Sequence, residues 1–174
     1  MKLESLHELF LTELRDMYDA EQQIVKALPK MIDKASYPEL KAAFNEHLEQ
    51  TQNQVTRLEE IFENLGEKAK AEKCKGIRGI IDEGEDLAGE SGDPAAVDAG
   101  IISSAQKVEH YEIASYGSLC SWAQMMGHQR ELQLLKQTLE EEKTADQKLT
   151  QLAERMVNVD AVRTAGGGSA PREF

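Results

Sequence analysis

The chain has 174 residues, enough for one compact domain with a buried core, and 30% of them are charged. The net charge of −12 argues against nucleic acid or an anionic membrane as the main partner, because both present negative phosphates. The sequence has no apolar run of about 20 residues, the length that a membrane-spanning helix needs. Charges interrupt the N-terminal segment throughout, so no signal peptide is predicted. We therefore expect a cytoplasmic protein in which Cys74 and Cys120 are reduced thiols.

Hydrophobic residues recur at helical spacing in the first half of the chain. This pattern predicts a first long helix over residues 3–35. A second helix is expected to begin at Ser36-Tyr37-Pro38-Glu39, which has the sequence of a capping box with proline in the first turn. Gly66 is the expected stop of this second helix.

The second half of the chain repeats this plan. A short amphipathic helix is expected at residues 77–89, before a break. Asp93 then provides an N-cap and Pro94 a first helical residue for a third long helix, which we expect to stop at Gly127. A fourth helix is predicted over residues 129–157, with leucine and methionine at helical spacing.

The four predicted long helices form two antiparallel hairpins, joined by a crossover of roughly 28 residues from 66 to 93. At a rise of 1.5 Å per residue, each helix would be about 40 to 50 Å long. Two hairpins with one long crossover are the ferritin-like topology. We therefore predict an all-α, ferritin-like antiparallel four-helix bundle over residues 1–157, with a short extra helix in the crossover. A Gly/Ser/Pro-rich flexible tail is expected at residues 158–174.

Two pairs of polar residues share one spacing in these helices. Gln54 follows Glu21 by 33 residues, and Glu142 follows Glu109 by the same number. Each pair falls on the apolar faces of two consecutive helices, and counting from the predicted turns puts all four residues at the same height in the bundle. Carboxylates in the seam of a bundle are costly unless a cation holds them. The pattern therefore indicates a metal site.

Further polar residues extend this site. Glu112 lies three residues after Glu109, and Asp146 lies four residues after Glu142, so each shares a helix face with its partner. Hard carboxylates with little imidazole favour iron or manganese over copper or a structural zinc, with zinc as a substitute. We expect two ions, or one. The predicted metal ligands are Glu21, His47, Gln54, Glu109, Glu112, Glu142 and Asp146.

The same residues also have explanations that need no metal. Glu21 fits the edge of its apolar stripe equally well, Glu109 and Glu112 fit a solvated face, and His47 fits a hydrogen-bonded core histidine. Protonation would lower the cost of burying the carboxyl groups by raising their pKa values. The alternative function is therefore a non-catalytic helical dimer with a vestigial polar core, acting as a structural or interaction protein.

Three stretches resemble one bacterial family. They are AQKVEHYEIASYG (105–117), LLKQTLEEEKTADQKLT (134–150) and HLEQTQNQ (47–54). They are similar to the YciE/YciF family of ferritin-like proteins, and the resemblance covers nearly the whole chain to about residue 157. It implies a rubrerythrin-like bundle with an extra crossover helix, often a dimer, and an association with bacterial stress responses.

The resemblance also implies roles for the glutamates. The wider di-iron family uses one glutamate from each of two helices and a Glu-x-x-His from each of the others. By that pattern Glu21 and Glu109 look like the single glutamates. Glu112 resembles the additional glutamate that rubrerythrins carry on the third helix, and Glu142 looks like the glutamate of the last helix.

This sequence departs from the family pattern at two positions. Ala145 stands where a histidine would follow Glu142, and Gln54 stands on the second helix where a bridging carboxylate is expected. A weaker, asymmetric or single-metal site fits these departures as well as a full di-iron centre does.

Two functions follow from a metal site of either kind. One is a redox-active di-iron or di-manganese carboxylate protein that reacts with peroxide or oxygen. The other is a stress protein that binds metal without turnover. Tyr18, Tyr111 and Tyr116 are expected near the proposed site. Tyr18 lies one turn before Glu21, either as a core packing residue or as a residue that hydrogen-bonds a ligand or passes electrons. We expect a homodimer with no nucleic-acid or membrane partner.

Overall fold

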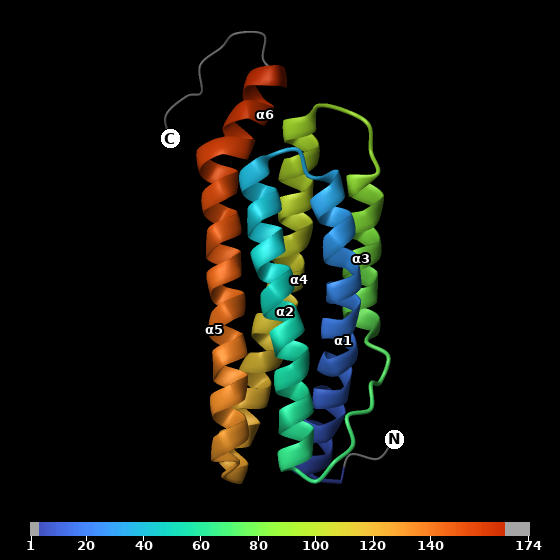
Figure 1. Cartoon of the computed structure of the whole chain (residues 1–174), viewed down its shortest axis with the longest axis vertical. Helices are drawn as coiled ribbons and strands as arrows, with labels where there is room; N and C mark the ends of the chain where they lie inside the picture. The colour runs from blue at the N-terminus through green and yellow to red at the C-terminus, as the bar shows by residue number, and fades with distance from the viewer. Residues whose placement is uncertain (1–3, 166–174) are drawn as a thin grey trace.

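The computed structural model describes residues 4–165, and these residues form helices joined by short loops (Figure 1). The long helices lie side by side, α1 and α2 forming one antiparallel hairpin and α4 and α5 the other. The shorter α3 lies in the crossover, against α1 and α4. The bounds are α1 (Leu6–Lys34), α2 (Pro38–Asn64), α3 (Lys75–Ala88), α4 (Pro94–Met126) and α5 (Gln129–Leu152).

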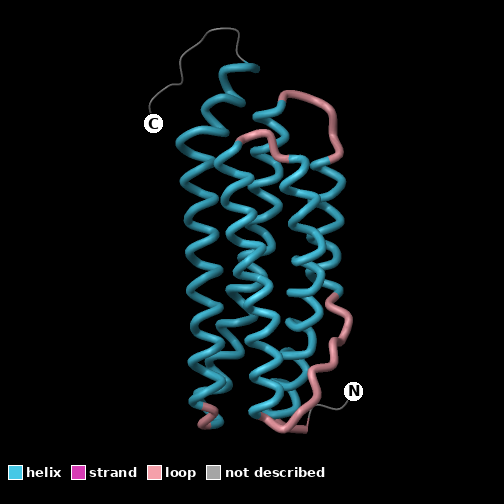
Figure 2. The backbone as a smooth tube through the Cα atoms, in the orientation of Figure 1, coloured by secondary structure: helices cyan, strands magenta, loops and turns pink. Residues whose placement is uncertain are grey.

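The crossover determines how the hairpins pair. Figure 2 shows one loop leading from the end of α2 to α3 and a second loop leading over the opposite end of the bundle into α4. As a result α2 and α4 run in the same direction, and every pair of neighbouring long helices is antiparallel (Figure 1). The predicted all-α, ferritin-like four-helix bundle with an extra crossover helix is therefore confirmed.

Several predicted helix ends are confirmed, each by its local chemistry. Gly66 and Gly127 follow α2 and α4 with φ of 71° and 79°, a left-handed conformation that costs glycine little. The Asp93 carboxylate caps α4 by accepting from the Ala96 N–H at 3.0 Å. Residues without a β-carbon or with a short acceptor side chain therefore mark these boundaries in the sequence.

The capping box predicted at Ser36 is wrong. Tyr37 is the N-cap of α2, without a capping side-chain bond, and Pro38 is the first helical residue. The N–H groups of Ser36 and Tyr37 donate instead to Asp98, a buried carboxylate on α4, at 2.8 and 2.9 Å. Asp98, 61 positions after Tyr37, thus replaces the local cap and ties the first hairpin to the second.

The last helix extends beyond its predicted end at residue 157. A π-helical turn (Ala153–Val157) continues α5, and α6 (Asn158–Ala165) follows it without a break. The Tyr37 hydroxyl donates to Asp160 at 2.8 Å and so holds α6 against the α1–α2 turn. The boundary predicted for the tail therefore falls inside a helix, and the rest of the predicted tail, residues 166–174, lies outside the described residues.

The apolar stripes of the helices meet in one core that surrounds a polar centre. Burying each large side chain contributes roughly 1.5–3 kcal/mol. Cys74 and Cys120 are buried free thiols, as predicted. No helix within residues 4–165 is both long and apolar enough to cross a membrane. The fully buried residues include Phe10, Leu14, Met17, Leu40, Leu58, Ile101, Leu119 and Leu135.

Candidate metal centre

A group of polar side chains from all four long helices lies inside the bundle. Helix α1 contributes one carboxyl group, α2 an imidazole and an amide, α4 two carboxyl groups and α5 one. None is more than 6% exposed, although charged groups are almost never fully buried unless they are paired. The residues are Glu21, His47, Gln54, Glu109, Glu112 and Glu142.

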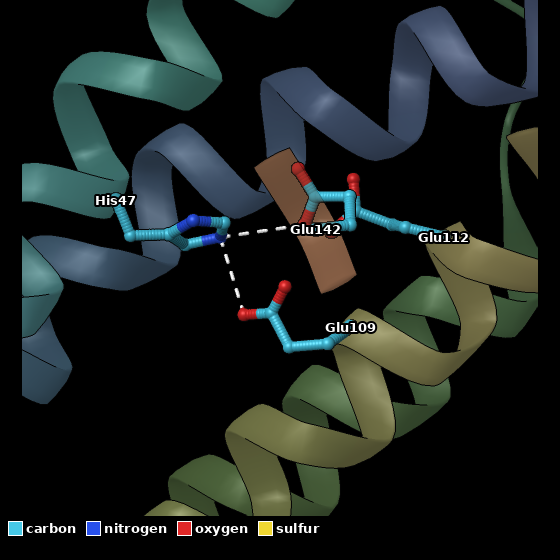
Figure 3. Close-up of side chains that lie close together, drawn as sticks. All are labelled: His47, Glu109, Glu112 and Glu142. Carbon is cyan, nitrogen blue, oxygen red and sulfur yellow. Dashed lines mark ion pairs between the residues drawn. The ribbon is translucent and has the colours of Figure 1, made fainter. Parts of the chain in front are cut away.

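Four of these side chains converge on one point (Figure 3). His47, Glu109, Glu112 and Glu142 each offer a ligand atom, and these atoms all lie within 4.8 Å of one another. His47 Nε2 is 3.3 Å from Glu109 Oε1 and 3.9 Å from Glu142 Oε2. Ligand atoms around one metal ion at about 2.1 Å are separated by about 3–4 Å. Three carboxylates and one imidazole therefore stand at distances that a single cation would bridge.

The cluster leaves many polar atoms without hydrogen-bond partners. A buried unsatisfied polar group costs about 1–3 kcal/mol, more if it is charged, so such atoms are rare unless something else binds them. A metal ion would satisfy carboxylate oxygens and an imidazole nitrogen together. The atoms are Glu21 Oε2, His47 Nδ1 and Nε2, Glu109 Oε2, both Glu112 carboxylate oxygens and Glu142 Oε2.

Burial strongly disfavours the charged form of three carboxyl groups in the cluster, those of Glu21, Glu109 and Glu112. It raises the pKa of Glu21 to about 8, with the Glu142 charge adding to the effect. The pKa values of Glu109 and Glu112 are raised well above the ordinary value, first by burial and then by the neighbouring carboxyl groups. The Glu21 carboxyl group adds to the rise in the pKa of Glu112, and the Glu142 carboxyl group adds to the rise in the pKa of Glu109. Without a cation the cluster therefore holds protons, which a metal would displace.

Neighbouring side chains orient the cluster. Gln54 Nε2 donates to Glu142 Oε1 and, at 3.0 Å, to Glu141. The amide nitrogen is a donor and not a ligand, so this contact positions the Glu142 carboxylate. Arg57 holds Glu141 in turn at 3.0 Å. The assignment of Gln54 as a metal ligand stays a prediction, with its carbonyl oxygen left buried and without a partner.

Asp146 is placed differently from the other predicted ligands. Its carboxylate accepts from Gln106 Nε2 at 2.9 Å and lies 3.3 Å from His110 Nε2. A residue four positions after Glu142 is about 40° further around the helix and one turn along it. Asp146 therefore lies beside the cluster but outside the convergent group of four, and its role as a ligand is untested.

Tyr116 makes a contact with Glu21 that was not predicted from the sequence. Its buried hydroxyl donates to Glu21 Oε1, whereas Tyr18, predicted near the same carboxylate, donates to Glu59 at 2.7 Å. Tyr116 lies four residues after Glu112 and so shares its helix face, a signal that would have placed it in the seam. Tyr111 faces away and donates to Asp16.

Comparison with known proteins identifies relatives along nearly the whole chain. Residues 5–162 match the family described as Domain of unknown function (DUF892). Protein YciF of Escherichia coli (strain K12) is 40% identical over 166 residues, covering 95% of this chain and 100% of that protein.

Solved structures of two relatives are similar to this chain over most of its length. The E. coli stress protein YciF matches with a TM-score of 0.86 and 41% identity, over 89% of this chain and 98% of that chain. YcfI from Rhodopseudomonas palustris, described only provisionally as a structural protein, matches with a TM-score of 0.84 and 46% identity, over 86% and 95%. A two-domain Anabaena variabilis protein with DJ-1/ThiJ/PfpI-like and ferritin-like domains matches over 95% of this chain and 40% of its own, at 20% identity and a TM-score of 0.54. That last likeness concerns the fold alone.

Proposed function

The chain belongs to the DUF892 family, and from its buried carboxylate cluster we propose that it is a ferritin-like metal-binding protein of the carboxylate type. The observation that carries the proposal is the set of buried ligand atoms without hydrogen-bond partners around His47, Glu109, Glu112 and Glu142. A vestigial polar core would be expected to have lost such groups or paired them, because each unpaired one destabilises the fold.

The donor set favours iron or manganese, with zinc as a substitute, since it combines several carboxylates with one imidazole. His47, Glu109 and Glu142 would be the donors to one ion, since each offers a ligand atom to the convergent group. Glu112 belongs to the same group, and Glu21 is one of the neighbours that raise its pKa, so Glu112 and Glu21 would be the carboxylates that hold a second ion. We therefore propose two ions, the second held by fewer protein ligands than the first.

When bound, iron or manganese would supply one-electron chemistry toward oxygen or peroxide. The side chains of this protein would hold the ions, exclude bulk water and fix the carboxylates. Gln54 restrains Glu142, and Tyr116 restrains Glu21, each through a buried hydrogen bond. Such partners of metal ligands commonly tune affinity and activity.

The physiological setting is part of the proposal, and one relative supports its link to stress. The E. coli protein YciF is called a stress protein, and we propose that this chain likewise acts in a bacterial stress response. We place it in the cytoplasm as a homodimer, with oxygen or peroxide as the small-molecule substrate and no nucleic-acid or membrane partner. Metal binding under oxidative conditions would link the site to that response.

Two glutamine variants test the metal site. Glu112→Gln keeps the size of a side chain whose two oxygens have no partner. Glu131→Gln is the matched control, a buried glutamate on α5 outside the cluster. Titration of chelator-treated protein with Fe(II) or Mn(II) under argon should raise the melting temperature of the wild type and of Glu131→Gln. Glu112→Gln should weaken the binding at least about tenfold, as losing a metal-linked contact does. Equal binding by both variants, or none by the wild type, would reject the site.

A further inference from the structure

Two pockets of opposite character reach the same end of the cluster, and Phe44, His47 and Glu109 line both. The first pocket lies beneath α3, between that helix and α1, α2 and α4, and has a volume of about 50 Å³. The second lies between α2, α4 and α5 and has a volume of about 20 Å³. The cluster can therefore be approached from two sides.

The pocket beneath α3 is apolar along its walls. Its polar side chains are Ser104 and, at the cluster, His47 and Glu109. A volume of about 50 Å³ exceeds what one water molecule needs, but the wall away from Ser104, His47 and Glu109 is apolar and offers none of the two to four polar partners that stabilise a buried water. Apolar cavities stay dry and take up apolar molecules such as xenon. The walls are formed by Ile24, Leu28, Met31, Ile80, Ile81 and Val108.

Close packing of the crossover helix limits the size of a guest. A Cβ atom on Gly84 would lie 3.2 Å from the Cβ of Ser104, so α3 lies close against α4 where it covers the pocket. The space suits a diatomic molecule better than an organic substrate, since ligand pockets for drug-sized molecules occupy about 300–1,000 Å³.

The second pocket has the opposite chemistry. Glu46 and Lys148 form an exposed ion pair at its rim, and Gln50 and Thr144 also line it. Hydrogen peroxide, which donates and accepts hydrogen bonds, would find partners here. It would lose them on entering the pocket beneath α3.

We propose that the apolar pocket beneath α3 binds dioxygen and leads it to the His47–Glu109 end of the cluster. The proposal rests on the proposed function, because oxygen delivered there has a use only if the cluster holds a redox metal. It adds that oxygen and polar oxidants approach by different routes. It also gives the crossover helix a function, as the cover of the oxygen pocket.

Xenon tests the pocket without any metal. In crystals of metal-free protein under xenon pressure, one xenon atom should lie among Ile24, Ile81 and Val108. Ala27→Leu adds bulk to the pocket wall and should lower xenon occupancy by about tenfold. Ala43→Leu is the matched control, an equally buried alanine that lines only the second pocket, and it should leave xenon binding unchanged. Absence of xenon from the wild-type pocket would overturn the proposal.

Oxygen kinetics test the route. In Fe(II)-loaded protein one O₂ accepts one electron from each of two Fe(II) ions, which become Fe(III), and with two protons leaves as hydrogen peroxide. Ala27→Leu should slow oxygen uptake about tenfold while leaving oxidation by added peroxide unchanged. Ala105→Leu, from the α4 side of the pocket, repeats the test if the first variant does not fold. Unchanged oxygen uptake in a variant that has lost xenon would reject the route. Failure of Fe(II) binding would instead reject the proposed function and leave the xenon result standing.

Discussion

Replacing Glu21 by glutamine should stabilise the metal-free protein, although it alters a fully buried residue. Burial raises the pKa of Glu21 to about 8, from 4.5 in the unfolded chain. A carboxyl group with a raised folded-state pKa contributes its stability below pH 4.5 and loses it as the pH rises through about 8. At pH 7 the free energy of unfolding is therefore lower by about 3 kcal/mol than at low pH. This figure is 1.36 kcal/mol for each pH unit between 4.5, the unfolded pKa, and 7.

Glutamine carries no such cost and still offers an oxygen to the Tyr116 hydroxyl. We therefore expect Glu21→Gln to raise the melting temperature of chelator-treated protein at pH 7 by roughly 6–12 °C, at 2–4 °C per kcal/mol. At pH 5 the gain should fall below about 1 kcal/mol, because the wild-type carboxyl group is then mostly protonated. Calorimetry at the two pH values measures this. A gain independent of pH, or a loss at pH 7, would refute the reasoning that burial keeps this group protonated.

Three further variants probe the surroundings of the cluster. Gln54→Glu adds a carboxylate beside Glu142, and it should tighten Fe(II) binding in titrations while lowering the stability of the metal-free protein; weaker binding would contradict this. Tyr116→Phe removes the donor to Glu21 and should cost about 1–3 kcal/mol in urea unfolding at pH 8, with a smaller loss at pH 5. Asp98→Ala leaves two backbone N–H groups of the α1–α2 turn unpaired and should cost about 2 kcal/mol or more by the same assay; an unchanged midpoint would show that water replaces the carboxylate.

Local chemistry explains which parts of the fold could be predicted from the sequence. Gly66, Asp93 and Gly127 mark helix ends because their conformations and caps depend on residues within a few positions. The cap of α2 could not be read in this way, because its acceptor, Asp98, lies on another helix. The continuation of the last helix to residue 165 also depends on a distant contact, between Tyr37 and Asp160.

The candidate metal site was likewise predictable from the sequence only in part. Heights counted from the helix turns put Glu21, Gln54, Glu109 and Glu142 at one level, since antiparallel helices of constant rise keep register, and all four are buried inside the bundle. The same count did not bring His47 into the convergent group. Which atoms converge depends on rotation about each helix, and spacing alone did not separate Asp146 from the group. The pocket beneath α3 could not be predicted, because its walls come from four helices and its cover depends on how closely the crossover packs.

The most direct test of the account is a crystal structure of Fe(II)- or Mn(II)-loaded protein with anomalous scattering recorded at the metal edge. We expect a peak among His47, Glu109, Glu112 and Glu142, and a second, weaker peak between Glu112 and Glu21. Protein that has taken up metal but shows no anomalous peak among these side chains would contradict the central claim that the buried carboxylates form a metal site.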